Sequence, residues 1–337
     1  TAIGIGSLSL TVSEIAEILS DRLQEPYGSF VLTLSAVLVE ILLLYIILLQ
    51  ANTDTNVVNT VKGGIISAVI VDMNVLLGLA VFVGGLKFAE QEHNKETSSA
   101  YTTILFVASI ALLVPSLLGK EHTPAVIQEV SMIMAAFLMI FYIFIIIFQT
   151  KTHTHFFKNT ARSRIFRLKR KMKEPEQNED DDYIFEKFNN IGLALSIFFF
   201  IAIIALGAEI FAHDGIILAK NYGISAGLSG LFIAIIAVAP EIVTAIKAAK
   251  NDEIQRVVNI AMGASTVSIL LTVPILVALA YFSGINFSLD FSPLEMGALI
   301  LTIILAWKTT DEGHTNYFEG ISHLMFFAAF TIIAIYY

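Results

Sequence analysis

The sequence contains no cysteine among its 337 residues. This absence excludes disulfide bonds, thiolate zinc sites and thiol catalysis, and it leaves the redox compartment undecided. Charged residues are also scarce, at 15% of the chain against about 25% in a typical soluble domain. Because hydrophobic residues make up 56% of the sequence, the composition excludes an ordinary soluble enzyme, a disordered chain and a nucleic-acid binder.

A cleavable signal peptide is absent from the beginning of the sequence as well. Residues 1–19 are only moderately apolar, include Glu14 and Glu17, and carry no basic leader. Since the chain does not start with Met, we expect a processed or otherwise missing segment to precede it.

Long apolar runs dominate what is present. Each strong run is near the ~20 residues that a helix needs to cross a bilayer, and none alternates with the period of two of a β-barrel strand. The sequence therefore predicts an all-α polytopic membrane protein with a short, weak first helix. The predicted helices cover about 1–20, 29–50, 61–83, 101–118, 125–149, 188–212, 224–249, 257–282, 293–307 and 318–337.

Basic residues indicate the orientation of these helices. The segment 151–173 holds nine of the twenty Lys and Arg residues, and loops rich in these residues stay in the cytoplasm. Threading the other helices from this anchor leaves only Lys62, Lys120 and Lys220 on the opposite side. We therefore expect a multi-pass protein of the cell membrane, inner or plasma, whose C-terminus lies outside the cytoplasm.

The predicted cytoplasmic loop, 151–187, separates a first transmembrane half, 1–150, from a second, 188–337. Its first part is basic and its second part is acidic. Two interpretations stay open, a solvated linker that fixes the topology and a cation-sensing element. The acidic residues of a regulatory metal site in this loop would be Glu179, Asp180, Asp181 and Asp182.

Three acidic residues interrupt the apolar runs, namely Glu40, Asp72 and Glu241. A carboxylate near the bilayer centre costs at least a few kcal/mol, so it persists where it has a partner or a function. The alternative is a protonated carboxyl group that is hydrogen-bonded between helices. Glu40 and Glu241 occupy comparable places in the two halves, on helices expected to run in opposite directions. This arrangement is typical of an inverted-topology repeat with a substrate site at the midplane.

Two facing carboxylates with nearby hydroxyl and carbonyl oxygens form an all-oxygen site, which suits hard cations such as Ca²⁺. We therefore predict Glu40 and Glu241 as metal ligands. Because burial and like-charge repulsion favour protonated carboxyl groups, protons and cations would compete for the same oxygens, which is the minimal mechanism of an antiporter. The remaining candidate ligands are Ser67, Asp72, Asn74, Ser265, Thr266, Ser268 and carbonyls freed at Pro240.

Five segments follow one another in the order of one family's motifs. They are EPYGSFVLTLSAVLVE (25–40), GGLKFAEQEHN (84–94), FQTKTH (148–153), PEIVTAIKAAKNDEIQRVVNIAMGASTVSILLTVP (240–274) and DEGHTNYFEG (311–320). In these segments the chain resembles the Ca²⁺/H⁺ exchangers of the calcium/cation antiporter superfamily, and it is most similar to their bacterial sodium/potassium/calcium–proton branch. The resemblance implies two inverted five-helix repeats and one extra helix. Of these eleven, about ten are visible here, the first incomplete. It also implies alternating access, with gating helices that slide past a core of four helices.

The chain departs from the family's pattern around both glutamates. Residues 36–38 and 237–239 replace the family's Gly-Asn-Ala, and Ile242 and Val267 replace a His and a Gln of the second repeat. The carboxylates are thus retained while much of the neutral ligand shell is not. This difference favours a monovalent cation over strict Ca²⁺ selectivity.

The sequence-based hypothesis is a secondary antiporter, not an enzyme, that exchanges Ca²⁺, or alternatively Na⁺ or K⁺, for H⁺ without a cofactor. We expect contact with membrane lipid and the transported cations and no nucleic-acid partner, and a homo-oligomer stays open. The alternatives are a cation/cation exchanger without proton coupling, a membrane-embedded metal-dependent enzyme, and a scaffold or sensor that depends on 174–186. The enzyme would need a second acidic motif beside Asp180–Asp182, and we find none.

Overall fold

The computed structural model places ten helices that are long and apolar enough to cross a membrane within the part of the chain that it describes. The predicted number of spans is therefore confirmed. The described residues are 1–337 except 24–26, 53–55, 120–121, 159, 161–183 and 337.

The first half contributes the helices α1 to α6. Their bounds are α1 (Ala2–Leu23), α2 (Tyr27–Leu48), η1 (Leu49–Asn52), α3 (Asn56–Ile70), η2 (Val71–Leu76), α4 (Leu77–Phe88), α5 (Lys95–Leu118) and α6 (Pro124–Ile147). The turns η3 (Phe148–Thr152) and η4 (Thr154–Phe157) follow α6. The first helix extends further than predicted, since its Ser and Glu residues dilute the apolar signal without interrupting the helix.

The second half contributes the helices α8 to α13. Their bounds are η5 (Ile184–Lys187), α8 (Asn190–Tyr222), α9 (Ala226–Lys250), α10 (Ile254–Val267), η6 (Ser268–Thr272), α11 (Val273–Phe282), α12 (Pro293–Thr310) and α13 (Tyr317–Tyr336). With 33 residues, α8 extends beyond the predicted 188–212.

Two spans are interrupted by a π-helical turn at corresponding places in the two halves. The turn η2 joins α3 to α4, and η6 joins α10 to α11. These two spans are also the most buried, with 83% of the central stretch of each buried against 50% or less in every other span found. Pro274 contributes to η6, because a proline cannot donate to the carbonyl four residues earlier. Since π-turns concentrate at functional sites, these two turns are the first place to search for one.

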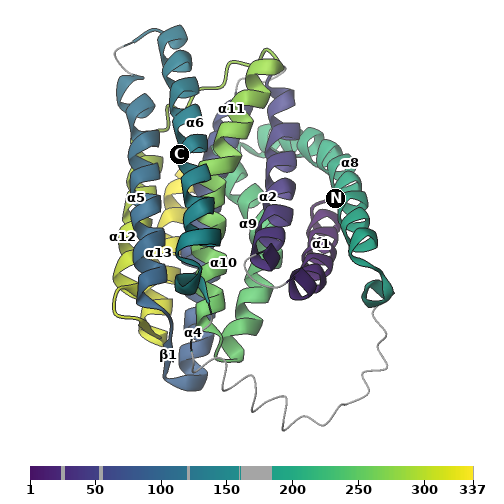
Figure 1. Ribbon diagram of the computed structural model, residues 1–337. Helices are drawn as coiled ribbons and strands as arrows, with labels where there is room; N and C mark the ends of the chain where they lie inside the picture. The colour runs from purple at the N-terminus through teal and green to yellow at the C-terminus, as the bar shows by residue number, and fades with distance from the viewer. Residues whose placement is uncertain (24–26, 53–55, 120–121, 159, 161–183, 337) are drawn as a thin grey trace.

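The helices form two packed groups around this centre (Figure 1). Helices α1 and α8 pack against each other and against α2 at one side of the molecule, whereas α12 packs on α5 and α13 packs on α4. The buried side chains divide in the same way. One hydrophobic cluster joins α1, α8 and two residues of α2, Val39 and Leu43, and a second, larger cluster comprises the rest of the core. The pair α1–α8 therefore packs through a hydrophobic cluster of its own, which rests on α2 and α9.

Helices α3 and α9 touch through glycine. A Cβ atom added to Gly230 would lie 2.5 Å from the Gly64 nitrogen and 2.8 Å from the Thr60 carbonyl oxygen. The two backbones are thus in direct contact, as small residues permit between membrane helices.

Two short strands join the two halves at one end of the helices. β1 (Glu90–Glu92) pairs antiparallel with β2 (His314–Asn316). Gln91 Nε2 also donates hydrogen bonds to the Ala249 carbonyl at 2.9 Å and to Asp252 Oδ1 at 3.0 Å. Three-residue strands carry too little period-two pattern to be predicted from sequence. Their pairing brings two of the five motif segments together.

His93 follows β1 and is buried beside it. Its Nε2–H donates a hydrogen bond to the Thr310 carbonyl at 3.1 Å. Burial lowers the pKa of this imidazole below its usual value of 6.5, because the charged ring would lose its hydration. His93 is therefore held neutral in the folded protein.

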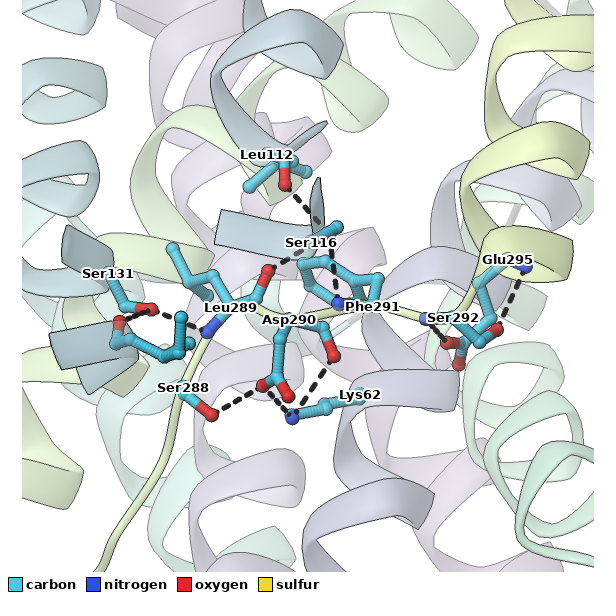
Figure 2. A network of polar contacts seen from close by, with 11 residues as sticks. Lys62, Leu112, Ser116, Ser131, Ser288, Leu289, Asp290, Phe291, Ser292 and Glu295 are labelled. Atoms are coloured by element: carbon cyan, nitrogen blue, oxygen red, sulfur yellow. Dashed lines mark hydrogen bonds and ion pairs between the residues drawn. The ribbon is translucent and has the colours of Figure 1, made fainter. Parts of the chain in front are cut away.

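A polar network lies where α3 and α12 begin, at the end of the helices opposite to β1 and β2, and Figure 2 shows its contacts. Lys62 Nζ of α3 lies 2.5 Å from Asp290 Oδ1 and 3.3 Å from the Asp290 carbonyl oxygen. This ion pair accommodates a lysine that would otherwise be buried without a partner. The other members of the network include Ser116, Ser131, Ser288, Leu289, Phe291, Ser292 and Glu295.

Candidate functional site

Glu40 lies on α2 and faces the π-turn η6 of the other half. Its Oε2 accepts hydrogen bonds from Ser268 Oγ at 2.8 Å and from Thr272 Oγ1 at 3.2 Å. Its Oε1 is buried without a hydrogen-bond partner in the part of the chain that the structure describes. One carboxylate oxygen is therefore held in place while the other is available to a ligand.

Asp72 lies on η2 and is also fully buried. Its Oδ2 accepts a hydrogen bond from Ser265 Oγ at 3.1 Å, and its Oδ1 has no partner among the described residues. Asp72 interacts electrostatically with both Glu241 and Glu40. The structure therefore groups all three predicted acids at the centre, one from α2, one from η2 and one from α9.

Glu241 differs from the other two acids because no described residue donates a hydrogen bond to its side chain. It follows Pro240 on α9, interacts electrostatically with Glu40, and borders a cavity of about 30 Å³. Such a volume is large enough for a water molecule or a small ion. The cavity is lined by Ser9, Val12, Ser13, Ala36, Val39, Ala237, Pro240, Glu241, Thr244 and Ile260.

The predicted neutral ligands divide into two groups. Ser265 and Ser268 donate to the carboxyl groups of Asp72 and Glu40, so they lie beside the acids. Ser67 and Thr266 are buried, but no hydrogen bond in the described residues links either to the acids. Their roles as ligands stay predictions.

Asn74 contacts a different set of partners. Its Nδ2 donates to Thr302 Oγ1 at 3.0 Å, and its Oδ1 accepts from His323 Nδ1 at 2.9 Å. Since His323 Nδ1 must then carry the proton, the neutral ring accepts at Nε2 from Thr309 Oγ1, 3.0 Å away. Both ends of the amide thus have a hydrogen-bond partner, which fixes Asn74 within η2, and its role as a cation ligand stays a prediction.

The site uses residues that sequence reasoning did not single out. Thr272, which donates to Glu40 Oε2, is one of them, and no motif in the sequence distinguishes it from the other Ser and Thr residues of these helices. Ser9, Ser13 and Thr244 reach the cavity only through the packing of α1 against α9. The acidic residues of the central loop, Glu179–Asp182, lie outside the described residues.

The arrangement is rich in oxygen and has little positive charge. Among the residues that the structure describes, no three acidic or histidine side chains converge closely enough to hold a metal ion by themselves. A cation here would therefore bind one or two carboxylates together with hydroxyl oxygens. Such a site can exchange a cation for a proton, because both neutralise the same carboxylates.

Comparison with known proteins identifies the family of the chain. The model of the family described as sodium/calcium exchanger protein matches residues 1–151 and 192–336. The sodium-potassium/proton antiporter ChaA of Escherichia coli is 27% identical over 97% of this chain and 86% of its own length. A Ca²⁺/H⁺ antiporter of Synechocystis is 24% identical over 88% of this chain and 78% of its own length.

Solved structures show the same fold at low identity. The structure of native YfkE matches with a TM-score of 0.79 at 19% identity, covering 100% of this chain and 91% of that one. The crystal structure of the H⁺/Ca²⁺ exchanger CAX matches with a TM-score of 0.69 at 15% identity, covering 99% and 83%.

Proposed function

The chain belongs to the sodium/calcium exchanger protein family, and from this membership we propose that it exchanges a cation for protons by alternating access. The observation that supports this most directly is the grouping of Glu40, Asp72 and Glu241 at the π-turns. Buried acids that lack cationic partners need a bound cation or protons for neutrality. Cation release would therefore be coupled to proton uptake at the same oxygens.

We propose a monovalent cation, Na⁺ or K⁺, as the transported ion, with Ca²⁺ as the second candidate. Hydroxyl groups, rather than additional carboxylates or amides, surround the acids, and Ca²⁺ usually takes 6–8 oxygen ligands. The relative with 27% identity is named a sodium-potassium/proton antiporter, whereas others are named Ca²⁺/H⁺ antiporters, which supports keeping both candidates.

The pair α1–α8 would supply the movement. The cluster of α1 and α8 is distinct from the main core and touches α2. The two helices would therefore slide together along α2 while the main core keeps its packing. We propose that the central loop lies in the cytoplasm and that the Lys62–Asp290 end faces outward. On that orientation, the glycine contact between α3 and α9 closes the outer side, while the cavity at Glu241 lies on the cytoplasmic side.

The membrane would contact the outer faces of the peripheral helices. Large apolar side chains are exposed on α6 and α8, among them Phe137, Phe144, Phe198 and Phe199. Exposed apolar area of this extent is unfavourable in water and favourable against lipid tails.

The test is reconstitution of the full chain in vesicles with a pH gradient, scanned over Na⁺, K⁺ and Ca²⁺. We expect flux driven by the gradient, and we expect Glu40→Gln and Glu241→Gln to abolish it. Glu209→Gln is the matched control, because Glu209 is an exposed acid within a span of the same protein. Flux that is unaffected by pH would instead support cation/cation exchange, and unchanged flux in both Gln variants would contradict the proposed site.

A further inference from the structure

Ser9 of α1 has an unexplained hydroxyl group. The residue is 96% buried, since its exposed fraction is 4%, and its Oγ has no hydrogen-bond partner in the described chain. Many Ser and Thr residues in these helices donate to the carbonyl four residues earlier, as Thr11 does to Ser7 and Ser35 does to Val31, whereas Ser9, like Ser98 and Thr266, does not. A buried hydroxyl group without a partner destabilises a fold. A ligand bound beside Ser9 would supply the missing partner.

The cavity that Ser9 borders contains one acid. Glu241 lies on the α9 side together with Thr244, and Ser13 lies beside Ser9 on the α1 side. Thr244 Oγ1 donates to the Pro240 carbonyl at 3.2 Å, so its lone pairs remain free to accept. The cavity therefore offers one carboxylate and three hydroxyl oxygens from two different helices.

The charge and volume of the cavity restrict its occupant. The single carboxylate of Glu241 balances a single positive charge, and Glu40 and Asp72 each have one oxygen bonded to a hydroxyl of η6 or α10 and do not line the cavity. A volume of about 30 Å³ has room for a dehydrated ion or a water molecule. A divalent cation would need a second carboxylate for neutrality, and Glu241 is the one acid among the described residues that line the cavity.

We propose that Glu241, Ser9, Ser13 and Thr244 form a binding station for one monovalent cation. This inference rests on the proposed function, because it names the cation class and the ligands at the same site. Ser9 is a direct ligand supplied by the α1–α8 pair, whereas Glu241 is supplied by the core. Occupancy of the station is thus coupled to the position of α1, since moving α1 removes two of the four oxygens.

The test is equilibrium binding of ²²Na⁺ to the purified full chain in detergent, measured without any flux. Ser9→Ala should weaken Na⁺ binding by about threefold to tenfold, the range expected for the loss of one neutral ligand. Ser9→Thr keeps the hydroxyl and should restore the affinity. Ser7→Ala, an exposed serine on the same helix, should leave it unchanged. Glu241→Gln should abolish binding.

The outcomes separate this inference from the proposed antiport. Wild-type affinity in Ser9→Ala would overturn the role of Ser9 even if exchange is intact. Tight Ca²⁺ binding with no competition by Na⁺ or K⁺ would overturn the monovalent assignment. Absence of all cation binding by the wild-type chain would also overturn the inference. Na⁺ binding that depends on Ser9, in a protein that shows no exchange driven by a pH gradient, would support the station and reject the antiport.

Discussion

Glu40 and Glu241 lie near the π-turns at corresponding places in the two halves of the chain, yet their surroundings differ. Glu40 is held by two hydroxyl groups of η6, whereas Glu241 faces a cavity and receives no hydrogen bond from the described residues. The first and fifth residues of η6 are Ser268 and Thr272, while the first and fifth residues of η2 are valines. Two different π-turns therefore produce a preorganised acid in one half and an adaptable acid in the other.

The largest expected effect comes from removing either acid. Glu40→Gln and Glu241→Gln should each reduce exchange to below about one-hundredth, because residues that act as one unit fail together. The double variant, with Gln at both positions, should lose about as much exchange activity as either single variant. Flux in vesicles measures this, and a double variant that loses much more activity than either single would show that the acids act independently.

The contact between α3 and α9 offers the next largest effect. Gly230→Ala places a Cβ against the backbone of Gly64, so we expect a loss of about 1–3 kcal/mol of stability. Gly297→Ala is the matched control, since a Cβ there meets nothing within 4 Å. Thermal unfolding in detergent compares the two, and equal melting temperatures would show that the helices do not touch.

The network behind η2 should matter for stability and for cation affinity together. His323→Ala removes the donor to the side-chain oxygen Oδ1 of Asn74. Because a buried acceptor is then left without a donor, the free energy of unfolding should fall by about 1–3 kcal/mol. The Michaelis constant for the cation should also rise, because η2 carries Asp72. Ser322→Ala, at a partly exposed neighbouring position, provides the control in both measurements.

The difference between the two π-turns can be tested by removing a hydroxyl group from η6 and by introducing one at the corresponding position of η2. Ser268→Ala should raise the Michaelis constant for the cation by about threefold to tenfold, since Glu40 loses one of its two donors. Val71→Ser should alter the Michaelis constant far less, as Glu40 keeps its partners. Equal effects of the two substitutions in flux measurements would mean that the difference between the π-turns is not functional.

The smallest expected effect lies where β1 and β2 join the halves. Because the pKa of His93 is lowered by burial, the unfolded chain binds its proton more readily than the folded chain. The contribution of His93 to the free energy of unfolding should therefore be fully present above about pH 6.5, and it should decrease as the pH falls below that value. Melting temperatures measured from pH 8 to pH 5 should show a smaller decrease for His93→Gln than for wild type. His122→Gln, at an exposed site, should follow the wild type.

Much of the fold was accessible from the sequence because hydropathy is a local property. Each apolar run predicts its own span, and the ten spans of the structure agree with those runs. The ends of the helices were less accessible. Helix α8, for example, continues past His213 and Asp214, polar residues that interrupt the apolar pattern without ending the helix.

The candidate site was only partly accessible. Glu40, Asp72 and Glu241 stand out because a charge in an apolar run is rare. The partners of these acids did not stand out. Ser268 was selected while Thr272 was not, and Asn74 was selected although its amide is bonded to Thr302 and His323.

What the sequence by itself determined is the class of the protein, its membrane spans, its family and the three acids in its interior. These follow from composition, hydropathy and motif order, which need no knowledge of neighbours. The tertiary structure alone decided which oxygens each acid meets and that Ser9 borders the cavity of Glu241. The physical reason is that side-chain direction depends on the register of two π-turns and on the packing of α1, and neither is a local property of the chain.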